Sequence, residues 1–255
     1  MEVHHHSHTS DSASHGSRKK WTHYLWEFLM LFLAVFCGFL AENQREHMVE
    51  HQREKTYMNS LITDLKEDTA TIRYVISFCI TKFHGMDTLA QLLNKDMLSN
   101  EEEKELYYLN SRYAANVMFM VFNERTIRQL LNSGNLRLVK KQGTSDSIIN
   151  YYGQTMDRVI DQGKICDEMS KRLVFSAEDI FDKSASLTKM NTDSSFYKDI
   201  RQEKMKLITK DKNVLRKYSQ MIITVQGMWA NYISMLFQMR KTGENLLVFL
   251  EKEYK

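Results

Sequence analysis

Proline is absent from all 255 residues of this chain, and only nine residues are glycine. Proline is the residue that most strongly interrupts an α-helix, because its ring clashes with the preceding turn and it lacks a backbone N–H donor. The chain is instead rich in Leu, Met, Lys, Glu and Gln, which favour helices. The sequence therefore predicts an all-α fold in which long helices form a bundle or a coiled-coil-like domain.

One apolar run lies near the amino terminus. It extends from Leu25 to Ala41 and is interrupted only by Glu27. A membrane-spanning helix needs about 20 mostly apolar residues. The segment from Trp21 to Ala41 has this length, with aromatic residues at its start that suit the membrane interface. We expect a single transmembrane helix, which makes the lipid bilayer the first predicted partner.

Two processing routes would remove or modify this segment. A secretory signal ends in a small-x-small cleavage site, whereas this run ends in Phe39, Leu40 and Ala41. A lipoprotein anchor requires a small residue before the modified cysteine, but Phe36 precedes Cys37. The sequence therefore favours an anchor that is retained.

Basic residues on the two flanks of the anchor set its expected orientation. Arg18, Lys19 and Lys20 are clustered at its amino end, whereas the basic residues beyond its carboxyl end alternate with glutamates. Cytoplasmic flanks carry the excess of Lys and Arg. We expect a single-pass protein of a bacterial inner membrane, with a cytoplasmic amino terminus and a periplasmic carboxyl-terminal domain.

Four segments follow from this pattern. Residues 1–18 are predicted to be a disordered His-rich tail, 19–41 a transmembrane helix, 42–57 a helical stalk and 58–255 an α-helical bundle domain. The stalk contains no helix breaker, so we expect the membrane helix to continue through it. Apolar spacings of four and three then begin, as in a heptad seam. The seam is Met58, Ile62, Leu65, Thr69, Ile72, Ile76, Cys79 and Phe83.

Local signals predict the elements that follow. The first long helix is expected to reach about Met97, and Ser99 with Glu102 forms a capping box for the next helix. The run 117–122, VMFMVF, has strand propensity but no second strand to pair with, so it is interpreted as a buried helix or a helix–helix joint.

Further signals define the second half of the chain. Asn123 is expected to cap a short helix that ends at Gly134, and residues 140–146 are expected to form a loop. A helix then begins at about residue 145, residues 183–195 form a polar connector, and a last helix covers about 196–252. Its apolar seam, mostly in spacings of three and four, is expected to be Leu207, Val214, Tyr218, Met221, Val225, Met228, Tyr232, Met235, Met239, Leu246 and Phe249.

The last helix contains an uncharged stretch from Tyr218 to Met239 that basic residues bracket on both sides. A second membrane span is one alternative, but the stretch contains many amide and hydroxyl side chains, which are costly in hydrocarbon. Thr224, Gly227, Asn231, Ser234 and Gln238 share one stripe at helical spacing. Since a solvated face normally carries charges, we expect this stripe to be buried against another helix or another subunit. The prediction is a homo-oligomer or a protein partner bound through the carboxyl-terminal helix.

Three stretches resemble an uncharacterised family of bacterial single-pass membrane proteins. They are MEVHHHSH at the amino terminus, KKWTHYLWEFLMLFLAVFCGFLAENQ and REKTYMNSLITDLKEDT. The later LLNSGNLRLV and IINYY are similar to the central region of that family, so the resemblance covers about residues 1–155. It implies that the histidine cluster is native and that the anchor is uncleaved. The family has no assigned activity.

Histidines supply the candidate metal ligands. His47, Glu50 and His51 match H-x-x-E-H, the inverted zinc-peptidase motif, in which two histidines share a helix face. The motif lies on the charged stalk, where a solvated helix face is the favoured interpretation, since catalytic zinc needs a third protein ligand. The amino-terminal histidines, which would bind Zn, Ni or Cu loosely, are His4, His5, His6 and His8. No catalytic or cofactor-binding residue is predicted.

Composition and motifs leave two function classes. The net charge of +3 is small and spread along the chain, so nucleic-acid binding is not expected. The three cysteines form no CxxC motif, and no phosphate-binding or hydrolase motif is present. The first class is a membrane-anchored sensor, adaptor or scaffold that acts through protein–protein contacts and is not an enzyme. The alternative is a metal-binding or zinc-dependent membrane protein.

Overall fold

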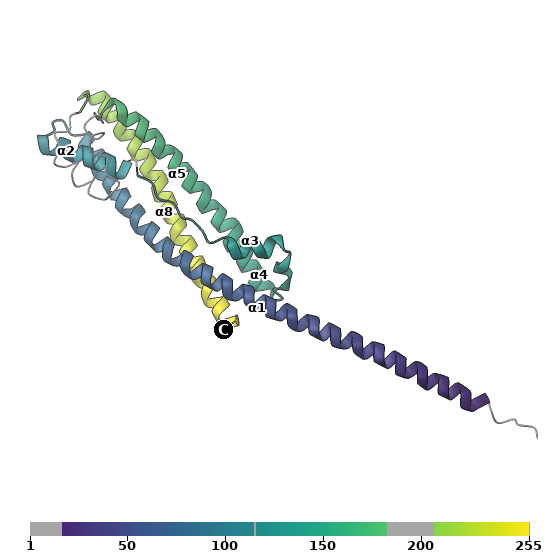
Figure 1. Cartoon of the computed structure of the whole chain (residues 1–255). Coiled ribbons are helices and arrows are strands. Elements are labelled where there is room, and N and C mark those ends of the chain that lie inside the picture. The colour runs from purple at the N-terminus through teal and green to yellow at the C-terminus, as the bar shows by residue number, and fades with distance from the viewer. Residues whose placement is uncertain (1–16, 115, 183–206, 255) are drawn as a thin grey trace, which may run out of the picture. The chain divides into compact units, whose positions relative to one another are not determined.

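The computed structural model describes residues 17–114, 116–182 and 207–254, and its elements are helical (Figure 1). The predicted all-α fold is confirmed. In these ranges the only β-pairing is an isolated bridge between Phe181 and Leu207. The elements are α1 (Ser17–Leu93), α2 (Asn100–Leu109), η1 (Asn110–Ala114), α3 (Arg125–Asn132), η2 (Asn135–Leu138), α4 (Gln142–Ile149), η3 (Asn150–Thr155), α5 (Met156–Ser176), η4 (Ala177–Asp179) and α8 (Lys212–Tyr254).

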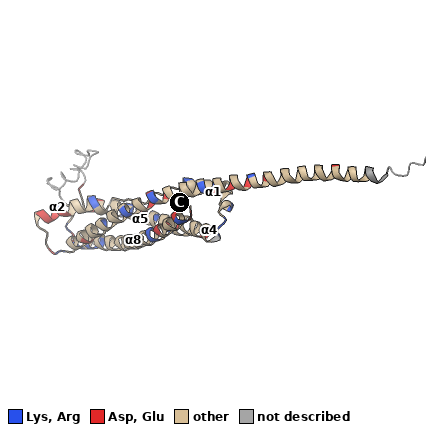
Figure 2. Ribbon diagram, turned by 90° about the horizontal axis from the view of Figure 1, so that it is seen from below, with Lys and Arg blue, Asp and Glu red and all other residues tan. Residues whose placement is uncertain are grey.

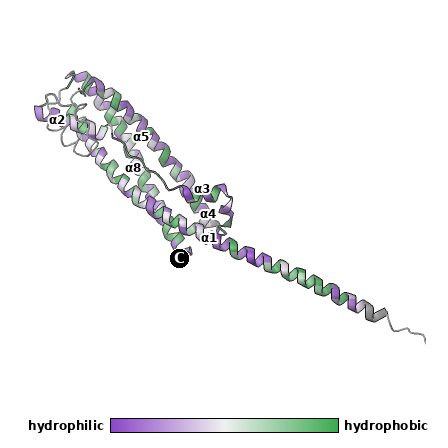
Figure 3. Cartoon of the chain, in the orientation of Figure 1, coloured by the Kyte–Doolittle hydropathy of each residue, from purple (hydrophilic) through white to green (hydrophobic). Residues whose placement is uncertain are grey.

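The chain divides into two compact units, residues 1–53 and residues 54–255. The described part of the first unit is the beginning of α1, and its residues from Trp21 to Val49 are all exposed. Among the described residues, α1 is the one helix that is long and apolar enough to cross a membrane (Figure 3). Its apolar stretch coincides with the predicted anchor, whereas most of the predicted tail, residues 1–16, lies outside the described residues.

The second unit is built on three long helices, α1 from Glu54 onward, α5 and α8. The heptad seam predicted for α1 is confirmed, since all of its residues from Met58 to Cys79 are buried and Phe83 is half-buried. The unit's largest fully buried side chain is Trp229 of α8. Burial of these apolar side chains is the main favourable term for such a bundle.

Helices α1 and α8 lie antiparallel, as side-chain hydrogen bonds along their length show. Near one end, Asn94 Nδ2 donates to Ser219 Oγ at 2.6 Å. Near the other end, Tyr254 Oη donates to Glu54 Oε1 at 2.7 Å. Because one of these part-buried pairs lies at each end, α8 is fixed in register along α1.

The run 117–122 is neither a helix nor part of a sheet. The first alternative, a buried helix, is wrong, whereas the second, a joint between helices, agrees with the position of the run between η1 and α3. Residues 116–123, here called the strap, cross the bundle in extended conformation between η1 and α3 (Figure 1). Seven extended steps cover about 23 Å. Asp68 and Lys82 of α1 bind the two ends of the strap. The 14 helical steps from Asp68 to Lys82 rise about 21 Å. The extended chain therefore matches the distance that it has to cross.

Several predicted helix boundaries differ from the structure. The capping box of Ser99 and Glu102 is present, but α1 ends at Leu93, before the expected Met97. The short helix α3 ends as expected before Gly134, which has a φ of 67° and so occupies the left-handed region that favours glycine.

Asn123 does not cap α3. Its backbone and side chain bind Asp68 instead, and Glu124 is the residue before the helix. Helix α4 begins at Gln142, inside the predicted loop. Helix α8 begins at Lys212, and the predicted connector and residues 196–206 lie outside the described residues.

Candidate functional site

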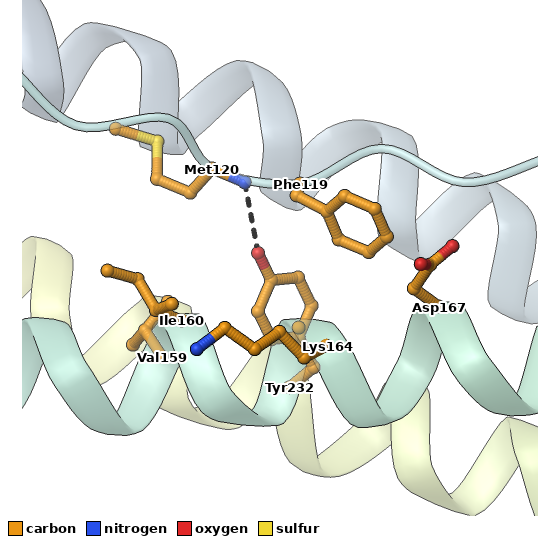
Figure 4. A pocket seen from close by; sticks show the side chains of 8 residues that line it. Phe119, Met120, Val159, Ile160, Lys164, Asp167 and Tyr232 are labelled. Carbon is orange, nitrogen blue, oxygen red and sulfur yellow. Dashed lines mark hydrogen bonds between the residues drawn. The ribbon is translucent and has the colours of Figure 1, made fainter.

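Three buried side chains bind the backbone of the strap. Lys82 Nζ donates to the carbonyl oxygen of Asn116 at 2.6 Å. The N–H of Met120 donates to Tyr232 Oη at 3.1 Å, as Figure 4 shows. The N–H of Asn123 donates to Asp68 Oδ1 at 3.0 Å. Since the strap belongs to no sheet, these side chains satisfy backbone groups that a strand ladder would otherwise satisfy.

Lys82 is fully buried at the start of the strap. Its Nζ also donates to the carbonyl oxygen of Tyr113, at the end of η1, and lies 4.9 Å from the ring centroid of Trp229. Burial lowers the pKa of Lys82 to about 7. A lysine with such a pKa can serve as a base or nucleophile, but here the ammonium is enclosed by carbonyl groups at a helix end. These contacts indicate a structural role, in which Lys82 satisfies carbonyls that lack partners within the helix.

A second buried polar cluster lies at the other end of the strap. Asp68 and Asp64 of α1 are both buried, and burial raises the pKa of Asp68 to about 6, with smaller contributions from neighbouring carboxylates. The Oδ2 atoms of both aspartates and the hydroxyls of Tyr151 and Tyr152 have no hydrogen-bond partner among the described residues. The raised pKa means that Asp68 can exchange a proton near neutral pH.

A small pocket lies between the strap and α5 (Figure 4). It encloses about 250 Å³ and is lined by Phe119, Met120, Val159, Ile160, Gly163, Lys164, Asp167 and Tyr232. Its two charged residues already have partners on α5, since Lys164 pairs with Asp161 and Asp167 pairs with Lys171. The pocket is therefore suited to a small apolar group and offers no unpaired acid or base for catalysis.

The exposed side of α8 is the other distinctive surface, and we call it the outer face. Its exposed positions between Tyr218 and Met239 carry no charge, although this stretch covers six turns. They are Gln220, Ile223, Thr224, Gly227, Ala230, Asn231, Ser234, Phe237 and Gln238. The predicted stripe is part of this face, and no described part of the chain covers it. None of the described helices therefore buries the stripe, and cover by another subunit stays a prediction.

Figure 2 marks the charged residues along α8, whose basic and acidic members differ in exposure. The exposed charged positions are all basic: Lys212, Arg216, Lys217, Lys241 and Lys252. The three acidic residues of α8 are only half-exposed and form ion pairs: Glu244 with Arg240, Glu251 with Lys66 and Glu253 with Lys141. The outer face thus has positive ends, an uncharged middle and no carboxylate.

The predicted metal ligands do not form a site in the described residues. His47 and His51 are exposed on α1, and His47 Nδ1 lies 4.0 Å from Glu50 Oε2. No group of three or more His, Cys, Asp or Glu residues in the described part of the chain is arranged to hold a metal ion. His4, His5, His6 and His8 lie outside the described residues, so loose binding of Zn, Ni or Cu by the tail stays a prediction.

No protein-family model, curated protein or solved structure matches this chain. The resemblance to an uncharacterised family of single-pass membrane proteins therefore stays a prediction. The geometry of the strap, the pocket and the outer face is what bears on function.

Sequence reasoning did not find the three residues that bind the strap. The sequence contains a signal for two of them. Asp68 lies three positions after the core residue Leu65, and Lys82 lies three positions after the core residue Cys79. Residues three apart share a helix face, so ionisable side chains at these positions had to be buried. A buried charge needs a partner, and the partner in both cases is the strap.

Proposed function

We propose that this protein is a membrane-anchored helical adaptor or scaffold that acts through protein–protein contacts made by the outer face of α8. The observation that carries the proposal is the uncharged middle of that face, which is exposed between Tyr218 and Met239. A helix face that is solvated throughout normally carries charged side chains. The centres of protein interfaces, in contrast, are depleted in charged residues.

The side chains of this stretch suit contact with another protein. Ile223 and Phe237 are 44% and 42% exposed and offer apolar area. Between them, Gly227 and Ala230 let a second helix approach closely. The amides of Asn231 and Gln238 can hydrogen-bond across an interface once water is excluded, and each such bond contributes about 1 kcal/mol.

The proposal includes an orientation in a bacterial inner membrane. The cluster of Arg18, Lys19 and Lys20 supports a cytoplasmic amino terminus, with the bundle in the periplasm. A reporter that is active only in the periplasm, fused after Lys255, should be active. Activity of a cytoplasmic reporter at the same position would contradict the orientation while leaving the adaptor role open.

Substitution of Asn231 tests the protein–protein contact. The full chain is isolated in mild detergent from the membranes of cells that naturally make it, so that a bound partner is retained. Its mass by light scattering should exceed that of one copy, and Asn231→Glu should reduce it to one copy. Once separated from the partner, the wild-type and Asn231→Glu chains should melt at the same temperature, because Asn231 is exposed in the single chain and surface changes are usually worth less than about 0.5 kcal/mol.

Asn59→Glu is the matched control, since it introduces the same charge at an exposed position of α1. It should leave both mass and melting temperature unchanged. If the wild-type chain isolated from these membranes has the mass of one copy, and Asn231→Glu does not alter that mass, the proposal is contradicted.

A further inference from the structure

We propose that the outer face of α8 binds a helix of a different protein, one whose own uncharged middle is flanked at both ends by Asp or Glu, and not a second copy of this chain. The inference rests on the proposed function and names the kind of partner for the same face. It comes from a difference within α8. The exposed charged residues of this helix are all basic, whereas its acidic residues are half-exposed and ion-paired.

The exposed charged residues at both ends of the outer face are basic. Arg216 and Lys217 precede the uncharged middle, and Lys241 follows it, all of them exposed. Every acidic side chain of α8 is instead held in an ion pair, for example Glu251 Oε1 at 2.7 Å from Lys66 Nζ. The acids therefore stabilise contacts within the bundle, and only the basic residues remain available to a partner.

A second copy of the chain is a poor match in either direction. If two α8 helices pack in parallel, Arg216 lies near its own equivalent, and so does Lys241. If they pack antiparallel, Arg216 lies near Lys241 of the other copy. Both arrangements bring like charges together at both ends, and juxtaposed like charges suppress the wrong partner. Carboxylates at both ends of a foreign helix turn the same contacts into attraction.

The spacing of the basic residues sets the length of the partner. Arg216 and Lys241 are 25 residues apart on one helix, which corresponds to about 37 Å at 1.5 Å per residue. A partner helix of about seven turns would place an acidic residue at each end. Its middle would contact Ile223, Ala230 and Phe237, where small and apolar side chains let two helices approach.

A lipid surface also attracts basic helices, but the outer face lacks the apolar side that such binding needs. Helices that lie on membranes bury a continuous apolar face rich in Trp, Phe and Leu. The corresponding residues of α8, such as Ile222, Trp229 and Leu236, are fully buried in the bundle. The exposed middle offers only Ile223 and Phe237 as large apolar side chains. The observations therefore favour a protein helix.

Photo-crosslinking from the outer face identifies the occupant. A benzophenone amino acid replaces Asn231 in the full-length chain, in the membranes of cells that naturally make the protein, and the crosslinked peptide is sequenced by mass spectrometry. The expected adduct is a peptide of another protein, from a predicted helix with Asp or Glu at both ends of an uncharged stretch. Arg216→Glu combined with Lys241→Glu should lower the adduct yield about tenfold, because attraction at both ends becomes repulsion.

A matched control carries the same charge change elsewhere. Lys164→Glu with Lys171→Glu alters two exposed lysines of α5 and should leave the adduct yield unchanged. In a second step, the Asp or Glu residues at the ends of the identified partner helix are changed to Lys. These changes should restore the adduct yield of the chain that carries both Arg216→Glu and Lys241→Glu. If Arg216→Glu and Lys241→Glu lowered the yield only by unfolding this chain, changes in the partner helix could not restore it.

The other outcomes separate the inference from the proposed function. A crosslinked peptide of this chain itself would show a second copy on the face and overturn the inference, while the adaptor role would stand. A lipid adduct, or a partner segment with basic ends, would also overturn it. Absence of any adduct from the outer face would contradict both the inference and the proposed function.

Discussion

Two helical stretches of this chain carry at most one charged residue each, and their side chains are distributed differently around the helix. In the first, from Leu25 to Ala41, apolar side chains surround the whole helix, all of them are exposed, and Glu27 is the one charged residue. In the second, from Tyr218 to Met239, one face is fully buried and the opposite face is exposed and carries amides and small residues. The distribution of side chains around the helix, more than the lack of charge, separates a membrane span from a bundle helix.

The two stretches also differ in the environment that their exposed side chains suit. On the first stretch, large exposed side chains such as Phe28 and Phe39 suit hydrocarbon. On the second, Asn231 and Ser234 would cost free energy in hydrocarbon but can pair with polar groups of a protein. The first stretch therefore has the side chains that suit lipid, and those of the second stretch support the proposed protein partner.

The largest expected effect comes from Trp229, on the buried face of the second stretch. It is fully buried, lies 5.7 Å from the ring of Tyr232 and is in contact with Lys82. Trp229→Ala should lower the free energy of unfolding by about 3–5 kcal/mol, measured by urea denaturation of the full chain in detergent. Trp26→Ala, in the first stretch, should leave the denaturation midpoint of the bundle unchanged. A small effect of Trp229→Ala would break the comparison, because the second stretch would then not be a core helix.

A charge in the first stretch should weaken membrane insertion but not the bundle. Val35 is exposed and lies well inside the apolar run. Val35→Arg should cost about 2.5–3.5 kcal/mol of insertion free energy, seen as a larger fraction of chain extracted from membranes by alkaline carbonate. Ala230→Arg, in the second stretch, should not change that fraction. Equal extraction of the Val35→Arg and wild-type chains would argue against a membrane span.

The buried face of α1 differs from that of α8 by carrying titratable charges, and this difference is measurable as a pH dependence. The pKa of Asp68 is raised to about 6 in the folded chain from an ordinary value of 3.8. Between these values the unfolded state has lost the proton and the folded state still binds it, so stability falls as pH rises from about 4 to about 6. The fall amounts to at most about 3 kcal/mol.

Asp68→Asn should remove this fall, because asparagine keeps an oxygen that can accept from the N–H of Asn123 but does not titrate. Unfolding free energies of both chains, measured across that pH range, test the prediction. A fall of the same size in the Asp68→Asn chain would assign the pH dependence to another group. Asp87→Asn, at an exposed position of α1, provides the control and should behave like the wild type.

The sequence predicted the seam of α1 correctly but that of α8 only in part. Met221, Met228 and Met235 were expected in the core, yet they are half-buried, and the residues that follow them, Ile222, Trp229 and Leu236, are buried instead. Each pair differs by one residue, which is a rotation of about 100° on a helix. Both registers are apolar, so periodicity alone did not decide between them; packing against α1 and α5 did.

The conformation of the strap and the exposure of the outer face were harder to predict than the helix seams. The apolar run 117–122 has the composition of a buried element, and nothing nearby in sequence indicates that Lys82, Tyr232 and Asp68 hold it extended. The stripe of Asn231 was recognised as unusual, but its exposure depends on which sides of α8 the other helices cover. Contacts between residues far apart in the sequence decide both features.

The strap also limits the order in which the chain can fold. Met120 and Tyr232, which join the middle of the strap to α8, are 112 residues apart. During synthesis the run VMFMVF therefore emerges long before its partner helix exists. Uncharged six-residue segments of this kind, without proline and with high β-propensity, are prone to aggregate while they are exposed. The interval before α8 is made is thus when the nascent chain most needs protection, by a chaperone or by a low local concentration.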